Sequence, residues 1–343
     1  MGNLITLWIW VPPKSPVFDY ARKEHFNIMY NINQISNYNK TIHDDYENLS
    51  CSVFLDSGGF QIKNSNFVLD VSVIKELVEK INKKKPDLCL PLDFPQNLWS
   101  PLNVKKKMWS MTFKSLKLFL KFAEEYSLKS EIIPVIHGYS QKAISKAVKN
   151  VMALRDWNKI ALGGQVGLLR KMYFVPNLGK LFCKNVKTLR DTVGEDVWIH
   201  VLGGGGMRTL PLIAILGANS GDSSGWEISA SYGRIIVPIK GGAKYLPLQK
   251  REPMMNKNEI KLFNECNCPI CQKVRGNKML LFSRSKKLRL IHNFFQLFSL
   301  EKELNKVCEE SDLLSWVKER YEKSSIWPIF EYSMKISRNN QVL

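Results

Sequence analysis

Short apolar runs alternate with lysine-rich amphipathic segments through the middle of the chain. The clearest apolar runs cover residues 52–55, 88–92, 132–136, 160–163 and 197–202, and the amphipathic segments include residues 71–82, 105–126 and 141–154. This alternation predicts βα units built around a parallel sheet. Because the strands are almost continuously apolar, we expect both faces of the sheet to be covered.

Polar residues or glycines follow each of these apolar runs at once. The segments that do so begin at Asp56, Asp93, His137, Gly164 and Gly203. Chemistry gathered at the carboxyl ends of many parallel strands is typical of a (β/α)8 barrel. A doubly wound nucleotide-binding sheet would instead need a GxGxxG turn, which residues 203–206 do not match. We therefore predict an α/β fold with a (β/α)8 TIM barrel over residues 1–240.

The pattern changes after about residue 240, where a cysteine cluster is followed by a lysine-rich stretch and helical segments. We predict that residues 241–343 form a zinc-binding subdomain with C-terminal helices packed on the barrel. At the other end of the chain, the apolar residues 5–11 are too few for a membrane span and follow no basic leader. They predict a buried first strand, and we expect no membrane partner.

The excess of basic residues bears on the kind of partner that the chain binds. The chain has 50 Lys and Arg against 31 Asp and Glu, a formal net charge of +19. Such an excess favours a polyanion as partner, because each neutralised phosphate releases counterions; the alternative is a merely solubilising lysine-rich surface. The basic residues are spread along the chain, which favours a broad nucleic-acid-facing surface. Seven cysteines, an odd number, indicate a reducing compartment, and we expect a cytoplasmic protein.

Three of the cysteines lie close together in a pattern typical of a metal site. Cys266, Cys268 and Cys271 form a CxCxxC motif, and His292 follows further along the chain. Three thiolates and one imidazole complete a tetrahedral shell that leaves no position for water. The motif therefore predicts one structural Zn²⁺ per chain. The alternative is three reduced cysteines in a loop with an unrelated histidine.

Three carboxylates also lie where strands are expected to end. They are Asp56 in the segment DSGGFQ, Asp93 in PLDFP and Asp222 in SGDSSG. Glycosidic chemistry needs one carboxylate at C1′ and another that transfers a proton, and carboxylates around one barrel mouth can do both. The alternative is that each aspartate caps the helix that follows its strand.

These motifs together resemble a known family. Asp56-Ser57-Gly58-Gly59-Phe60-Gln61 is similar to the DSGG(F/Y)Q motif of tRNA-guanine transglycosylases, and residues 160–164 are similar to their second glycine motif. The cysteine cluster with His292 resembles their zinc site, and the motifs occur in the family's order. The resemblance covers residues 50–300.

The resemblance implies a ping-pong base exchange in a zinc-containing barrel. By position in the motifs, Asp222 matches the nucleophile and Asp56 the general acid/base. The resemblance also implies a substrate-binding set of residues that recognise or stack on the base, namely Ser57, Phe60, Gln61, Asp93, His137, Gly163, Gly164 and Gln165. Within this set, Asp93 matches the carboxylate that binds the Watson–Crick edge. His137 stands where the tRNA enzymes usually carry glutamine.

One departure bears on the substrate. In the tRNA enzymes the nucleophile is followed by a proline-threonine-arginine segment, whereas Asp222 is followed by Ser223-Ser224-Gly225-Trp226. This departure resembles the DpdA-type DNA-modifying branch of bacteria and phages, so we expect a DNA-guanine transglycosylase. Its partners would be DNA, a free 7-deazaguanine base such as 7-cyano-7-deazaguanine, and accessory DNA-modification proteins.

The sequence leaves other readings open. One alternative is a tRNA-guanine transglycosylase, and another is a non-catalytic subunit of the same superfamily. Trp226 either stacks on a base next to a flipped guanine or packs in the core. His200 faces either the barrel interior or the site.

Overall fold

The computed structural model describes residues 4–10, 15–17, 27–32, 52–59, 69–309 and 312–338. Nine of its strands form one parallel sheet in the order β5-β4-β3-β2-β1-β9-β8-β7-β6, and β10 (Arg234–Ile236) and β11 (Ala243–Tyr245) form a separate antiparallel pair. The nine strands are β1 (Thr6–Trp10), β2 (Asn27–Asn31), β3 (Val53–Asp56), β4 (Leu88–Cys89), β5 (Glu131–Ile132), β6 (Val135–Ile136), β7 (Lys159–Leu162), β8 (Trp198–Val201) and β9 (Ser220–Ser223). The apolar residues near the start of the chain thus form β1 in the middle of this order, as predicted.

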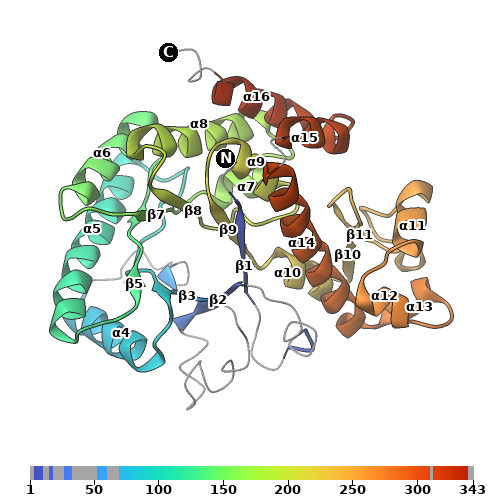
Figure 1. Cartoon of the computed structure of the whole chain (residues 1–343), viewed down its shortest axis with the longest axis horizontal. Helices are drawn as coiled ribbons and strands as arrows, with labels where there is room; N and C mark the ends of the chain where they lie inside the picture. The colour runs from blue at the N-terminus through green and yellow to red at the C-terminus, as the bar shows by residue number, and fades with distance from the viewer. Residues whose placement is uncertain are drawn as a thin grey trace.

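β5 and β6 are the two halves of one interrupted strand, and this strand closes the barrel. β5 pairs with β4, and β6 pairs with β7. Between them, Ile133 N donates to Cys89 O at 2.9 Å, and Pro134 O accepts from Ala161 N at 2.9 Å. Pro134 has no N–H to donate, which accounts for the interruption. The sheet therefore closes on itself, and the predicted (β/α)8 barrel is confirmed (Figure 1).

Helices cover the outside of the barrel. They are α4 (Val71–Lys84), α5 (Leu102–Glu125), α6 (Gln141–Met152), α7 (Val166–Lys171), α8 (Pro176–Val193) and α9 (Thr209–Ile215). The three helices predicted from amphipathic periodicity are α4, α5 and α6. Asp70 and Ser140 cap α4 and α6, because their side-chain oxygens accept from the second or third backbone N–H of the helix.

Side chains fill the barrel interior, so chemistry is confined to its mouth. The buried residues of this inner cluster are Trp8, Met29, Phe54, Leu88, Leu90, Ile133, Val135 and Ala161. Trp8 and Phe54 meet edge to face with ring centroids 5.2 Å apart, and Phe54 meets the ring of His200 at 5.1 Å in the same way. The larger hydrophobic core lies between the sheet and the surrounding helices.

The chain after β9 leaves the barrel and returns to it through α14. The elements are α10 (Gly225–Ser231), β10 (Arg234–Ile236), β11 (Ala243–Tyr245), η2 (Pro247–Gln249), α11 (Lys257–Asn264), α12 (Pro269–Lys273), α13 (Lys278–Arg284), α14 (Lys286–Glu309), α15 (Leu313–Tyr321) and α16 (Trp327–Arg338). α14 runs from the α11–α13 group to the barrel (Figure 1). There Glu301 and Asn305 accept from the backbone N–H groups of Leu7 and Ile5, each at 2.8 Å. The domain boundary expected at residue 240 stays a prediction.

No helix in the described ranges combines the length and the apolar character that crossing a bilayer requires.

Candidate active site and metal centre

Asp56, at the end of β3, is a carboxylate whose protonation the fold changes strongly. Burial, together with the negative charges of Asp93 and Asp222, raises the pKa of Asp56 from 3.8 to about 7. Hydrogen bonds from Gly58 N at 3.2 Å and Asn31 Nδ2 at 3.1 Å act in the opposite direction. The three predicted acids therefore do share one site, and Asp56 can both give and accept a proton near neutral pH.

Asp222 in β9 is held by one of its two carboxylate oxygens. Oδ1 accepts from Gly203 N at 2.6 Å and lies 3.2 Å from His200 Nε2. The described residues provide no hydrogen bond to Oδ2, and the side chain is 22% exposed. Gly205 N donates to Asp222 O at 2.8 Å, and a Cβ at position 205 would lie 2.7 Å from the carbonyl carbon of Asp222. The glycine run after β8 thus lets the backbone approach Asp222 and leaves one oxygen open.

His200 in β8 contacts the carboxylate of Asp222 from the barrel interior. Its ring is fully buried, with Nδ1 2.8 Å from Ser220 Oγ and Nε2 facing Asp222. The ring also stacks on Trp198 at 5.8 Å. The sequence left two alternatives for His200, and both hold: its ring packs in the barrel interior, and it contacts a site carboxylate.

Asp93 and His137 form a second buried pair at the mouth. Asp93 Oδ2 lies 2.8 Å from His137 Nε2, and the two residues are 4% and 2% exposed. His137 Nδ1 has no hydrogen-bond partner among the described residues. A Cβ at Gly163 would lie 2.6 Å from His137 Cε1, and one at Gly164 would lie 3.0 Å from Nδ1. The two glycines thus leave room for the imidazole, whose second nitrogen can bind a ligand.

Two further predicted residues join the loops behind this pair. Ser57 Oγ donates to Pro91 O at 3.1 Å. The fully buried Gln165 donates through Nε2 to Gly138 O and Gly163 O, and its Oε1 accepts from Asn185 Nδ2 at 2.9 Å. These side chains hold the strand-end loops in place, and their predicted contact with substrate stays a prediction. Phe60 and Gln61 lie outside the described residues.

Gly59 is expected to tolerate no side chain. A Cβ there would lie 2.2 Å from both Asp93 O and Asp93 Oδ1, so Gly59→Ala must displace the Asp93 carboxylate. We expect a loss of about 100-fold in the kcat/KM of the base exchange that the resemblance implies, as for a misplacement of about 1 Å. Gly167→Ala is the matched control, because a Cβ at position 167 meets nothing within 4 Å. Equal activity of the two variants would contradict this geometry.

Asp56→Asn is expected to stabilise the fold in a pH-dependent way. Because the pKa of Asp56 is raised from 3.8 to about 7, the folded protein binds more protons than the unfolded chain between these values. The free energy of unfolding of the wild type therefore falls as the pH rises through that window. The gain in Tm of Asp56→Asn should grow up to about pH 7 and then level off, as thermal unfolding at several pH values would show. The exposed Asp156→Asn serves as control, and a gain independent of pH would argue against a raised pKa.

The four residues of the predicted metal site come together. The ligand atoms of Cys266, Cys268, Cys271 and His292 all lie within 4.8 Å of one another. His292 Nδ1 lies 3.7, 3.5 and 3.4 Å from the three Sγ atoms. A tetrahedral zinc with bonds of about 2.3 Å to sulfur and about 2.0 Å to nitrogen has S···N edges of roughly 3.5 Å. The donor set therefore fits a metal ion in a closed shell.

The surroundings of the cluster tie it to the segment that follows Asp222. His292 Nε2 lies 2.9 Å from Ile236 O. The next residue, Asn293, accepts from Ile236 N at 2.7 Å and donates to Trp226 O at 3.1 Å. Such partners orient the ligands of a metal, and here they also fix α10 and β10. The Cys3His cluster is thus connected through His292 and Asn293 to the segment that follows Asp222.

Trp226 is a core residue in this arrangement. Its side chain is fully buried, and its ring meets Phe294 edge to face with centroids 5.8 Å apart. The reading in which Trp226 stacks on a base is therefore wrong. The apolar contact with α14 accounts for a tryptophan at this position.

Residues 24–325 match the model of the family described as queuine tRNA-ribosyltransferase, or TGT. That span is most of the 343 residues. The chain belongs to the queuine tRNA-ribosyltransferase family.

Two curated proteins of similar sequence carry a related name. The tRNA-guanine(15) transglycosylase of Sulfolobus acidocaldarius is 24% identical over 325 residues, which are 92% of this chain and 58% of that protein. The protein of the same name from Saccharolobus solfataricus is 23% identical over 322 residues, with coverage of 90% and 58%. The chain thus spans less than two thirds of the length of these relatives.

Proposed function

We propose that this TGT-family chain exchanges guanine in tRNA for a 7-deazaguanine base through a covalent aspartyl intermediate. The observation that carries the proposal is the meeting of Asp56, Asp93 and Asp222 at one barrel mouth, with the pKa of Asp56 raised to about 7. Membership of the family and the names of the two relatives support this chemistry.

The same comparisons support tRNA over DNA as the nucleic acid. Both relatives are named for tRNA, and their similarity covers 92% and 90% of this chain. The expectation of a DNA substrate depended on the four residues after Asp222, of which Trp226 is buried in the core. A segment whose aromatic residue packs in the core is weak evidence for a substrate, so the tRNA alternative is now the better supported one.

The first half-reaction breaks the glycosidic bond. The open oxygen of Asp222 attacks C1′, the bond from C1′ to N9 breaks, and its electron pair stays on guanine. Asp56 in its protonated form gives its proton to the departing purine, which leaves as neutral guanine. In the second half-reaction Asp56 takes a proton from the incoming base, whose nitrogen displaces Asp222 from C1′.

Asp93, His137, Gly163 and Gly164 would recognise the base. A carboxylate accepts from the N–H groups of the guanine Watson–Crick edge, and the hydrogen bond of 2.8 Å to His137 fixes its orientation. The unpartnered Nδ1 of His137 offers one further contact. Phe60 and Gln61 keep the stacking and binding roles that the resemblance implies.

We further propose that the Cys3His cluster holds Zn²⁺ in a structural role. Bound zinc would supply a cross-link between α12 and α14, and it would take no part in the transfer. The cluster has four protein ligands and hence no open position. The hydrogen bonds of His292 and Asn293 would carry its effect to α10 and β10.

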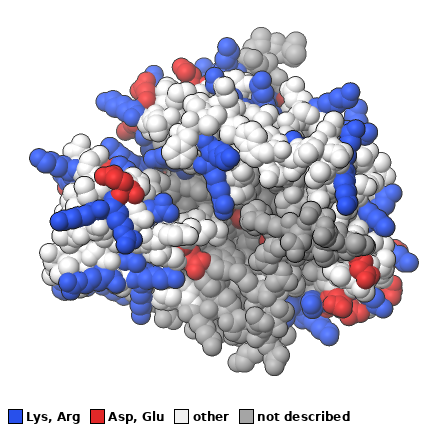
Figure 2. Space-filling view, turned by 180° about the vertical axis from the view of Figure 1, so that it is seen from behind, with Lys and Arg blue, Asp and Glu red and all other residues white. Residues whose placement is uncertain are grey.

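The net charge supports the contact with RNA. The formal charge of +19 is large for a chain of 343 residues. Figure 2 shows one face of the molecule on which Lys and Arg are widely spread while Asp and Glu occur in small groups. Such a surface attracts a phosphate backbone and makes binding depend on salt.

An assay of guanine exchange tests the substrate. The purified chain is incubated with labelled guanine and either total tRNA or duplex DNA, and the label in each polymer is counted. We expect incorporation into tRNA only. Label in DNA alone would return the protein to the DNA-modifying branch, and label in neither would favour the non-catalytic alternative.

A further inference from the structure

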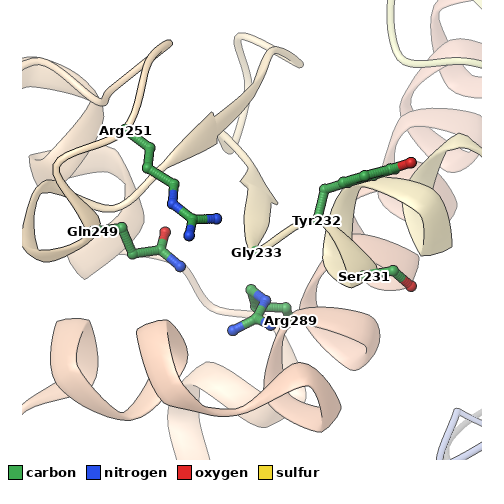
Figure 3. A pocket seen from close by; sticks show the side chains of 6 residues that line it. All are labelled: Ser231, Tyr232, Gly233, Gln249, Arg251 and Arg289. Atoms are coloured by element: carbon green, nitrogen blue, oxygen red, sulfur yellow. The ribbon is translucent and has the colours of Figure 1, made fainter.

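A pocket with two arginines lies where α10 ends and the chain enters the β10–β11 hairpin. Its volume is about 470 Å³, and it is lined by Ser231, Tyr232, Gly233, Gln249, Arg251 and Arg289 (Figure 3). Small-ligand sites measure about 300–1,000 Å³. No lining residue is acidic, so the pocket offers positive charge and hydrogen-bond donors.

Arg289, in the first turn of α14, is a buried cation held in a fixed orientation. It is 7% exposed. Its Nε donates to Ala230 O at 3.0 Å, and Nη1 donates to Phe282 O at 2.7 Å and Ser283 O at 3.0 Å. None of the described residues forms an ion pair with it or accepts from Nη2. Burial lowers the pKa of Arg289. Since a buried charge without a counter-charge is costly, an anion in the pocket would supply what the fold lacks.

Arg251 and Gln249 complete the donor set from the opposite wall. Figure 3 shows their side chains turned toward Arg289. Arg251 is exposed and forms no ion pair with any described residue. Gly233 has φ of +81°, and a Cβ there would lie 3.0 Å from Gln249 Nε2. Two guanidinium groups with an amide between them match the several acceptor oxygens of a phosphate.

The pocket lies close in sequence to the proposed nucleophile. α10 starts at Gly225, three residues after Asp222, and has seven residues. A helix of that length spans about 10 Å, a distance that a few nucleotides cover. We infer that the pocket binds a backbone phosphate of the nucleic-acid substrate a few nucleotides from the exchanged guanine. This inference rests on the proposed function and adds a positioning contact to it.

Arg251→Gln tests the contact, with Arg275→Gln as the matched control. Both arginines are exposed, and only Arg251 lines the pocket. Binding of fluorescein-labelled tRNA is measured by anisotropy at several salt concentrations, without free base, so that no turnover is involved. We expect Arg251→Gln to weaken binding roughly tenfold and to reduce the slope of log K against log salt by about 0.7–0.9. Arg251→Lys should lie between that variant and the wild type, and Arg275→Gln should resemble the wild type. Thermal unfolding of each variant checks the fold.

The outcomes separate this inference from the proposed function. Equal affinities and salt slopes for Arg251→Gln and Arg275→Gln would overturn the phosphate contact even if guanine exchange is normal. Free phosphate has the same ligand chemistry as a backbone phosphate. Titration calorimetry with inorganic phosphate distinguishes the two sources. Loss of free phosphate binding in Arg251→Gln with unchanged tRNA binding would make this a small-anion site and overturn the backbone assignment. Tight tRNA binding that depends on Arg251 in a chain that exchanges no guanine would leave the contact standing and refute the proposed activity.

Discussion

Asp222→Asn is expected to abolish guanine exchange, with a fall in kcat of at least about 10⁴-fold. The amide cannot attack C1′, although it can keep the hydrogen bond from Gly203 N that holds Oδ1 at 2.6 Å. The variant should therefore fold normally and bind tRNA with an affinity close to that of the wild type. The measurement is the rate of labelled guanine incorporation into tRNA under saturating conditions.

The exposed Asp156→Asn is the control for this variant, since it makes the same chemical change before β7, at the opposite end of the strand from the one that carries the site. It should exchange guanine at the wild-type rate. Exchange by Asp222→Asn within about tenfold of the wild type would transfer the nucleophile role to Asp56 or Asp93.

The second large effect concerns the metal centre. Cys268→Ser removes one of four ligands whose donor atoms lie within 4.8 Å of one another. We expect the metal content to fall from about one zinc per chain to nearly none. Tm should fall by roughly 10 °C or more, because the binding free energy of a structural zinc is folding free energy. Elemental analysis and thermal unfolding measure the two changes.

Cys308→Ala is the control that distinguishes the effect of losing the metal from the effect of losing a buried thiol. Cys308 is also buried in the region of α14 but lies outside the cluster. This control should keep its zinc. A chain that is free of metal yet folds and exchanges guanine as well as the wild type would refute a structural zinc site.

The apolar runs predicted β1, β3, β4, the interrupted strand of β5 and β6, β7 and β8, and amphipathic periodicity predicted α4, α5 and α6. β2 and β9 lie outside the predicted runs. The apolar runs at residues 52–55 and 197–202 became β3 and β8, each displaced by no more than a residue or two at its ends. Polar residues at the ends of such runs predicted that Asp56 and Asp93 would lie close together, because parallel strands place all their carboxyl ends at one edge. The charge of Asp93 does act on Asp56 in the structure, and the catalytic roles of both residues stay predictions.

The contacts around Asp222 could not be read from the sequence in the same way. They depend on the register between β8 and β9, where His200 pairs with Ser220. That register brings Gly203 N to Asp222 Oδ1 across 19 residues of chain. In the sequence, residues 203–206 mark the end of an apolar run and do not match a nucleotide-binding turn. The hydrogen bond from Gly203 to Asp222 could be predicted only if the pairing of β8 with β9 were already known.

The expectation of a DNA substrate gained no support, because it too depended on a tertiary contact that the sequence does not show. Trp226 follows Asp222 closely in sequence, yet α14 covers its ring from more than sixty residues further along the chain, where Phe294 makes the contact. Comparison of residues 223–226 with a family motif alone cannot show that Trp226 packs against α14. The sequence did predict that Cys266, Cys268, Cys271 and His292 would come together, because the CxCxxC spacing is typical of a metal site, and the fold brings their donor atoms within 4.8 Å of one another.

The most direct test of the central claim is to trap the covalent intermediate. The chain is mixed with tRNA in the absence of an incoming base, and the product is resolved on a denaturing gel and mapped by mass spectrometry. The account predicts an enzyme–RNA adduct at Asp222, formed with release of one guanine and reversed by adding guanine. Guanine exchange without an adduct, or an adduct at Asp56 or Asp93, would contradict it.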